Sequence, residues 1–157
     1  SSVAQQLQSL QELHTASSWI QTVVTTEETN SQFRVPLGSA KMLYVALGEV
    51  RAGIDLSDFT KEDVVIDSEI HLRLPKAKIL SSRLDLERSY VYDVRKSALL
   101  APDTIELQST AQKMALEKVI KSAVEVGVVK TAGENAALFL ERFLETASGR
   151  EVVIEFE

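Results

Sequence analysis

The sequence predicts an α+β domain with a mixed, mostly antiparallel sheet, two C-terminal helices packed on one face and an N-terminal amphipathic helix. Three observations predict this class. Short runs rich in β-branched and aromatic residues, typical of strands, fill the chain up to about residue 94. The hydrophobic periodicity then becomes helical over 103–126 and 131–147. A final alternating run at 152–156 follows, and this order of elements is typical of α+β rather than alternating βαβ proteins.

Length and composition indicate an ordinary globular protein. The chain has 157 residues, of which 45% are hydrophobic and 25% charged. A chain of this size can bury a sizeable core without disulfides or a structural metal. We predict an amphipathic helix or linker at 1–17, followed by a single α+β domain at 18–157.

The first segment has a narrow apolar stripe at helical spacing, made by Val3, Leu7, Leu10 and Leu13, among many glutamines. A helix of this length is marginal in water by itself, so it must dock on another surface. It could pack on its own domain, act as a linker, or pair with a second copy. We predict that it contributes more to self-association, as a homo-oligomer contact, than to the domain core.

The strand-like runs differ in how they alternate. Trp19–Thr26 is dense in β-branched residues, and 42–54 is the longest run. In that long run the apolar parity changes at Gly48, which predicts a β-bulge there. The run 64–74 is either a hairpin or one long strand with one wet face, and 90–94 is a further short strand.

The helical part has clear boundaries. Pro102 and Asp103 favour a helix start, and Gly127 a stop. Thr131 and Glu134 have capping-box spacing, which predicts the start of the second helix. In that helix we expect Phe139, Phe143 and Ala147 to form a row that faces the sheet. Truncating Phe143 to alanine would then be strongly destabilising.

Composition argues against several kinds of chemistry. The net charge of −6 disfavours nucleic acid as a partner, because binding phosphate needs a basic face. The chain has no cysteine, which excludes thiol catalysis and cysteine-ligated zinc. His14 and His71 are isolated from each other in the sequence, and the acidic residues around 55–67 do not have the spacing of an EF-hand. We therefore expect no metal and no cofactor.

Two loops hold the ligand-binding candidates. The first contains Asp55 and Asp58, and the second contains Ser81, Ser82, Arg83 and Asp85. If the two loops met in one cleft with perturbed carboxylates, they could form an enzyme site. The alternative is turn chemistry, because Asp and Ser side chains bind nearby backbone amides. In the same way, Gly53 is expected to adopt an unusual backbone angle and Asp55 to cap the turn after it.

Three blocks of sequence resemble a known family. They are Ala52-Gly53-Ile54-Asp55-Leu56, then Leu74-Pro75 with Ile79-Leu80, and Tyr92-Asp93. The chain is similar over about 18–157 to the family called domain of unknown function 4230. The resemblance implies a bacterial protein whose domain follows one N-terminal membrane helix, absent from this sequence, and is held outside the cytoplasm. It implies no catalytic residues, because the family has no assigned activity.

These observations favour a non-enzymatic binding or assembly module, tethered to a membrane. Two alternatives remain open. The first is an enzyme with an Asp/Glu or Ser/Arg site near loops 53–58 and 81–85. The second is a carrier of a small ligand or lipid, which would need a large apolar cavity.

Overall fold

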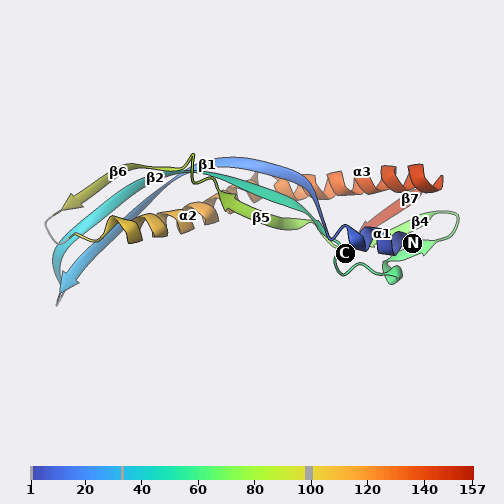
Figure 1. The fold of residues 1–157 in the computed structure, drawn as a ribbon, viewed down its shortest axis with the longest axis horizontal. Coiled ribbons are helices and arrows are strands. Elements are labelled where there is room, and N and C mark those ends of the chain that lie inside the picture. The colour runs from blue at the N-terminus through green and yellow to red at the C-terminus, as the bar shows by residue number, and fades with distance from the viewer. Residues whose placement is uncertain (1, 33, 98–100) are drawn as a thin grey trace. The chain divides into compact units, whose positions relative to one another are not determined.

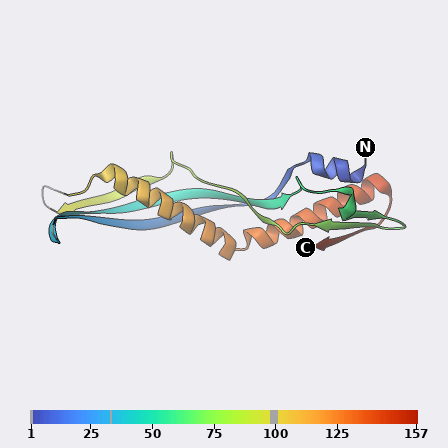
Figure 2. The ribbon, with the colours of Figure 1, turned by 90° about the horizontal axis from the view of Figure 1, so that it is seen from below.

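The computed structural model describes residues 2–32, 34–97 and 101–157, and it confirms the α+β class (Figures 1 and 2). Within these residues three helices and seven strands form. The helices are α1 (Val3–Ser9), α2 (Thr104–Glu125) and α3 (Val128–Ser148). The strands are β1 (Glu12–Gln32), β2 (Val35–Asp55), β3 (Val64–Ile66), β4 (Ile70–Leu74), β5 (Lys78–Leu84), β6 (Tyr90–Ser97) and β7 (Val152–Phe156). A short 3₁₀ turn, Lys61–Asp63, precedes β3.

The chain divides into two compact units, which are described separately. Unit 1 contains residues 1–18, 50–81 and 124–157, and unit 2 contains residues 19–49 and 82–123. The strands form two sheets where the sequence suggested one. One sheet has the order β1-β2-β5, with β6 also paired to β2, and the other has the order β3-β4-β7.

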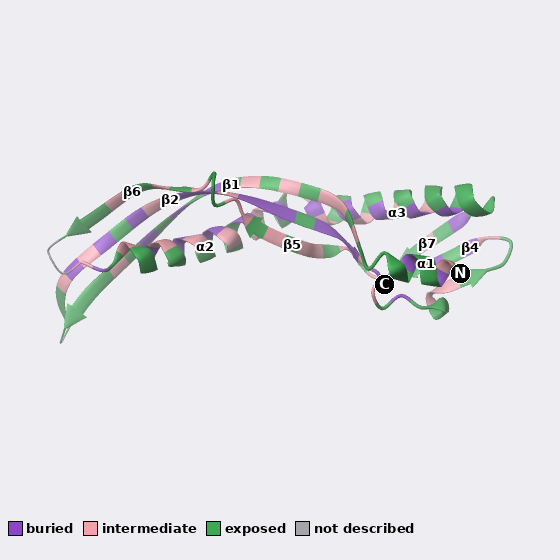
Figure 3. Cartoon of the chain, in the orientation of Figure 1, coloured by how far each residue is buried: buried purple, intermediate pink, exposed green. Residues whose placement is uncertain are grey.

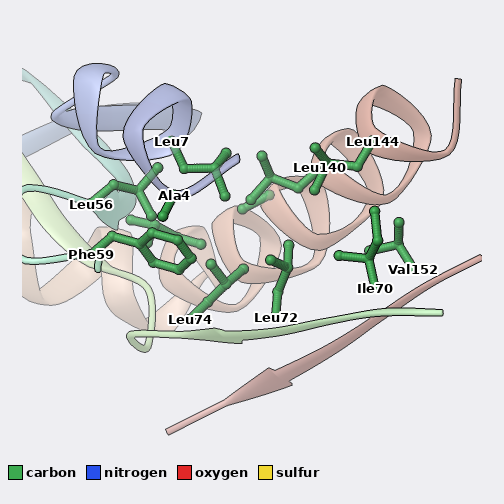
Figure 4. Close-up of a cluster of buried hydrophobic side chains, with 12 residues drawn as sticks. Ala4, Leu7, Leu56, Phe59, Ile70, Leu72, Leu74, Leu140, Leu144 and Val152 are labelled. Atoms are coloured by element: carbon green, nitrogen blue, oxygen red, sulfur yellow. The ribbon is translucent and has the colours of Figure 1, made fainter. Parts of the chain in front are cut away.

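Unit 1 is built on the three-stranded sheet. The run 64–74 is a hairpin, because β3 and β4 pair antiparallel, whereas β7 joins β4 in parallel. Alternate residues of β4 point into the core, where helices α1 and α3 contribute their apolar sides (Figure 4). The buried cluster consists of Ala4, Leu7, Ile54, Leu56, Phe59, Ile70, Leu72, Leu74, Ala136, Leu140, Leu144 and Val152.

Unit 2 places α2 against the other sheet. Every fourth residue of α2 is buried, and three of these residues are alanines that allow the helix to lie close to the strands. The largest buried side chain of this unit is Tyr44. The core cluster consists of Val24, Ala40, Met42, Tyr44, Ala46, Leu107, Ala111 and Ala115.

The N-terminal helix is shorter than predicted. It ends at Ser9, and Gln11 takes a positive φ of 59°, so that Leu13 already belongs to β1. Ala4 and Leu7 are buried in the core of unit 1, while Leu10 is exposed. The apolar side of the helix therefore packs within its own unit, and a role of this helix in self-association stays a prediction.

The bulge expected at Gly48 is not there. Even-numbered residues of β2 are buried from Ala40 to Ile54 without a change of parity. Gly48 instead permits close packing, since an added Cβ would lie 2.7 Å from Cγ1 of Val119 on α2. The register irregularity lies between β2 and β6, where Tyr92 is the extra residue and is 67% exposed.

The two long helices begin and end near their predicted positions, with one exception. Asp103 accepts a hydrogen bond from the amide of Ile105 at 2.9 Å, as expected for the start of α2. However, α3 begins at Val128 after Gly127, which has a φ of 94°, so the predicted capping box at Thr131 does not form the helix start. No helix among the described residues is long and apolar enough to cross a bilayer.

Candidate functional site

Part of the side of α3 that faces away from the core is apolar. Helix α3 buries one row of residues spaced four apart, Val128, Ala132, Ala136, Leu140 and Leu144. The adjacent row contains Phe139 and Phe143, which are 48% and 50% exposed, and Leu138 beside them is also exposed. Figure 3 shows this alternation of buried and exposed turns along α3. The prediction that Phe139, Phe143 and Ala147 face the sheet is therefore wrong.

The physical reason lies in the size of the side chains. The inner row of α3 contains Ala132 and Ala136, whose small side chains allow the helix axis to approach the sheet, as bulky aromatic rings would not. The sequence did contain a signal. Apolar residues between 136 and 144 surround the whole helix, so one sheet cannot cover them all.

The exposed residues line an open groove of about 580 Å³. The rings of Phe139 and Phe143 stack with centroids 6.0 Å apart and planes inclined by 14°. The residues around them are Asn135, Leu138, Arg142, Thr146 and Ala147. Arg142 is the one charged residue that lines the groove, and it has no ion-pair partner among the described residues.

A second, polar pocket of about 290 Å³ lies elsewhere in unit 1, and it contains two of the residues that the sequence singled out. Asp55 and Asp58 both line it, together with Asp63, Arg73 and Lys78. Oδ1 of Asp55 accepts hydrogen bonds from the amide and the hydroxyl of Ser57, at 3.0 and 2.6 Å. The expectation that Asp55 caps the turn is thus confirmed.

Ion pairs hold the remaining charges of this pocket in place. Nη2 of Arg73 donates to Oδ1 of Asp63 at 3.1 Å, and its Nε lies 2.9 Å from Oε1 of Glu157. Nζ of Lys78 lies 3.6 Å from Oδ2 of Asp55. The pocket is therefore a network of opposite charges that largely satisfy one another.

This environment keeps the two aspartates ionised. The hydroxyl and amide of Ser57, and then Lys78, hold the pKa of Asp55 below its usual value. The amide of Thr60 and the guanidinium of Arg73 do the same to the pKa of Asp63. A general acid or base works best with a pKa near the working pH, and these shifts go in the opposite direction. The pocket can therefore bind charge, but it is poorly suited to proton transfer.

The second predicted loop has different surroundings. Ser81, Ser82 and Arg83 lie within β5 and not in a surface turn, and Ser82, Arg83 and Asp85 belong to unit 2. The guanidinium of Arg83 lies 5.3 Å from the ring centroid of Trp19, and its Nε lies 3.4 Å from Oε1 of Glu49.

Asp85 has a structural role at the end of β5. Its Oδ1 accepts hydrogen bonds from the amides of Glu87 and Arg88, at 3.1 and 3.3 Å, so it caps the turn that leads to β6. Sequence reasoning missed Trp19 as the partner of Arg83, because strand alternation by itself does not show which residues lie on the neighbouring strands.

The part of the chain that the structure describes contains no group of three side chains that could hold a metal ion. Nε2 of His14 lies 3.2 Å from Oε1 of Glu12, and Nε2 of His71 lies 3.4 Å from Oε2 of Glu69. Ligand binding by Asp55, Asp58, Ser81, Ser82, Arg83 or Asp85 stays a prediction.

Comparison with known proteins bears on the family and not on the activity. No functionally described protein and no solved structure matches this chain. A family model, described as "Protein of unknown function (DUF4230)", matches residues 5–154, which is almost the whole chain. The resemblance noted in the three sequence blocks is confirmed, and the chain belongs to the family of domain of unknown function 4230.

Proposed function

We propose that this chain is a non-enzymatic binding module whose partner docks on the exposed apolar face of α3. The observation that carries the proposal is the pair of stacked, half-exposed rings of Phe139 and Phe143 beside exposed Leu138. Contiguous apolar surface of this kind, with polar residues around it, marks interaction sites in soluble domains. Aromatic residues also dominate the binding energy of protein interfaces.

The occupant we propose is an amphipathic helix of a partner protein, with an apolar stripe and one acidic residue. The groove runs along α3 from Asn135 to Ala147, which at 1.5 Å per residue is about 18 Å, or some three helical turns of a partner. Helix-in-groove recognition reads apolar residues at this spacing. Arg142 supplies the charge complementarity, because it lines the groove and has no acidic partner among the residues that the structure describes.

The alternatives have weaker support. A carrier buries most of its ligand in a cavity, whereas the groove on α3 is open along one helix. An enzyme would need a group with a pKa suited to proton transfer or a nucleophile, and the pKa values of Asp55 and Asp63 are lowered. Asp55 and Asp58 of the polar pocket remain the best candidates for that second function.

We also propose that the domain is held at a bacterial membrane by a segment outside this sequence, on the extracytoplasmic side. The support is the family resemblance alone. The complete reading frame tests attachment, and fractionation of cells that express it, with protease access from outside, tests the side. Recovery of the full-length protein in the soluble fraction would contradict the proposal.

The docking proposal is tested with a fluorescently labelled synthetic peptide. The peptide is an amphipathic helix with leucines at i, i+3, i+4 and i+7 and one glutamate beside them. A peptide of the same composition in scrambled order is the control. We expect the first peptide to bind the wild-type chain in anisotropy titrations, and F139A/F143A to weaken binding at least about tenfold, as for interface hot spots.

Two further variants make the result specific. R142E should also weaken binding, and a peptide with lysine in place of its glutamate should restore it. V65A removes an exposed apolar side chain of β3, on the other face of the small sheet from the core, and should leave binding unchanged. Equal binding of the scrambled peptide would contradict the proposal, and binding of dodecanoate that F139A/F143A abolishes would favour the carrier.

A further inference from the structure

Strand β1 is an open sheet edge over much of its length in unit 2. Among the described strands, β1 is paired with β2 alone, and unit 2 contains β1 from Trp19 onward. The backbone groups on the outer side of an edge strand have no ladder partner, and they form a template for another strand.

The sequence of this edge lacks the features that usually prevent such pairing. From Trp19 to Thr26 the strand reads Trp-Ile-Gln-Thr-Val-Val-Thr-Thr, with no charged residue, no proline and no glycine. The uncharged stretch extends back to Thr15 in the sequence. Natural edge strands are normally protected by lysine, proline, a bulge or a covering element, and segments rich in β-branched residues without charge pair readily.

Helix α2 lies beside part of this edge, where Met114, Glu117, Lys118 and Lys121 line a hollow with Val23, Val24 and Thr25. Nζ of Lys118 donates a hydrogen bond to the carbonyl oxygen of Val23 at 2.9 Å. This carbonyl accepts from a side chain, so we infer that it points away from β2. Outward-pointing backbone groups alternate along a strand, so the groups of Gln21 and Thr25 share that direction. A single flexible lysine side chain can move aside when another strand approaches.

We propose that the β1 edge of unit 2 pairs antiparallel with the β1 edge of a second copy, so that one sheet continues across a twofold axis. Two identical strands are complementary to each other in antiparallel orientation, and a twofold contact closes on itself. The eight residues from Trp19 to Thr26 span about 27 Å, which is longer than the usual strand of globular proteins.

The absence of charge within this strand removes one obstacle to pairing with a second copy of this chain. Each copy has a net charge of −6, so most contacts between two copies bring like charges together. The stretch from Trp19 to Thr26 has no charge of its own, so two copies can pair there without like charges opposing each other within the strand. The charged residues of α2 that line a hollow with Val23 and Thr25 carry both signs: Glu117, Lys118 and Lys121. This contact is independent of the groove on α3, which belongs to unit 1.

A charge-swap experiment on the full chain tests the pairing. Side chains of Thr22, Val24 and Thr26 are buried, whereas Gln21 and Thr25 point to the exposed face, so charging these two residues does not disturb the core. We expect the light-scattering mass of the wild type to rise toward twice the 17.3 kDa of one chain as concentration increases through the micromolar range.

The variants Q21K/T25K and Q21E/T25E should each associate at least about tenfold more weakly, because like charges then oppose each other across the twofold contact. An equimolar mixture of the two variants should recover the doubled mass. The control S109K/T110K places the same charge on exposed residues of α2 and should associate as the wild type does, after allowance for net charge.

A second measurement does not depend on disrupting the contact. The chain has no cysteine, so Q21C can be spin-labelled at one position, with T110C on α2 as the control. We expect dipolar broadening between copies for the label at residue 21 that is clearly stronger than at residue 110. A wild type that stays monomeric, a mixture that does not recover, or equal broadening at both positions would overturn the proposal. None of these results affects peptide binding at α3, so the two proposals fail separately.

Discussion

Replacing Gly53 by alanine should damage unit 1 severely, although alanine differs from glycine by one methyl group. Gly53 does not have a positive φ, so the expectation of an unusual backbone angle was wrong. The constraint is space. A Cβ at residue 53 would lie 2.8 Å from the carbonyl carbon of Leu13 and 2.9 Å from Cα of His14, and closer still to the carbonyl oxygen of Leu13. These are backbone atoms, which cannot rotate away.

The expected loss of unfolding free energy follows from the displacement of the β1 backbone that the added Cβ requires. Ordinary contact of a Cβ begins at 3.4 Å, so the carbonyl carbon of Leu13 alone would have to retreat by about 0.6 Å, and its carbonyl oxygen by more. Overpacking of this kind costs about 1–3 kcal/mol. The movement also strains the 2.6 Å hydrogen bond from the amide of Leu56 to the carbonyl of Gln11, which contributes about 1 kcal/mol. The α1 segment, with buried Leu7, is attached to the same stretch of chain. We expect G53A to lower the free energy of unfolding by about 3 kcal/mol.

The assay is urea unfolding followed by circular dichroism, combined with hydrogen exchange at the Leu56 amide to report on unit 1 specifically. G133A is the matched control, because a Cβ on that glycine in α3 would meet only the methyl group of Ala77 at 3.6 Å. Alanine there should stabilise the helix by about 0.5–1 kcal/mol. If G53A unfolded within about 0.5 kcal/mol of the wild type, the close approach of β1 and β2 would be wrong.

Further predictions separate the inner and outer faces of α3 and test the ion pairs. F143A should lower the free energy of unfolding by less than about 1 kcal/mol in urea melts, because its ring is half exposed, whereas L140A should cost about 2–5 kcal/mol; the reverse order would mean that the two faces are exchanged. The folded-state pKa of Asp63 lies below its ordinary value of 3.8, so its ion pair stabilises the fold above that pH and less as pH falls through the folded pKa. D63N should therefore be less stable than the wild type at neutral pH, with a difference that shrinks in acid-unfolding titrations below pH 3.8; a constant difference would contradict this reasoning.

The fold class could be predicted because local patterns carry it. The switch from strand alternation to helical period near residue 103, and the stop at Gly127, place both long helices within a few residues. The hairpin of β3 and β4 follows from turn residues between two runs of one parity. These features depend on residues that are close together in the sequence, so one sequence is enough to predict them.

The predictions that were wrong concern features that depend on contacts between distant segments of the chain. The row of Phe139 and Phe143 looked like the core face of α3, because aromatic residues are usually buried, but packing distance selected the row that contains Ala132 and Ala136. Gly53 was explained by local backbone freedom, and the structure shows that a strand forty residues earlier lies against it. Division of the strands into two sheets likewise depends on pairing that local alternation does not reveal.

Three residues in the blocks that resemble the family have structural roles. Gly53 admits the backbone of β1, Asp55 caps the turn that follows β2, and Tyr92 is the extra residue of a β-bulge. None of them lines the groove on α3, and none lies in β1. Residues that support the fold do not by themselves determine what the exposed surfaces bind. Function in this domain should therefore be sought first by altering the outer face of α3 and the edge of β1, with the signature residues left intact.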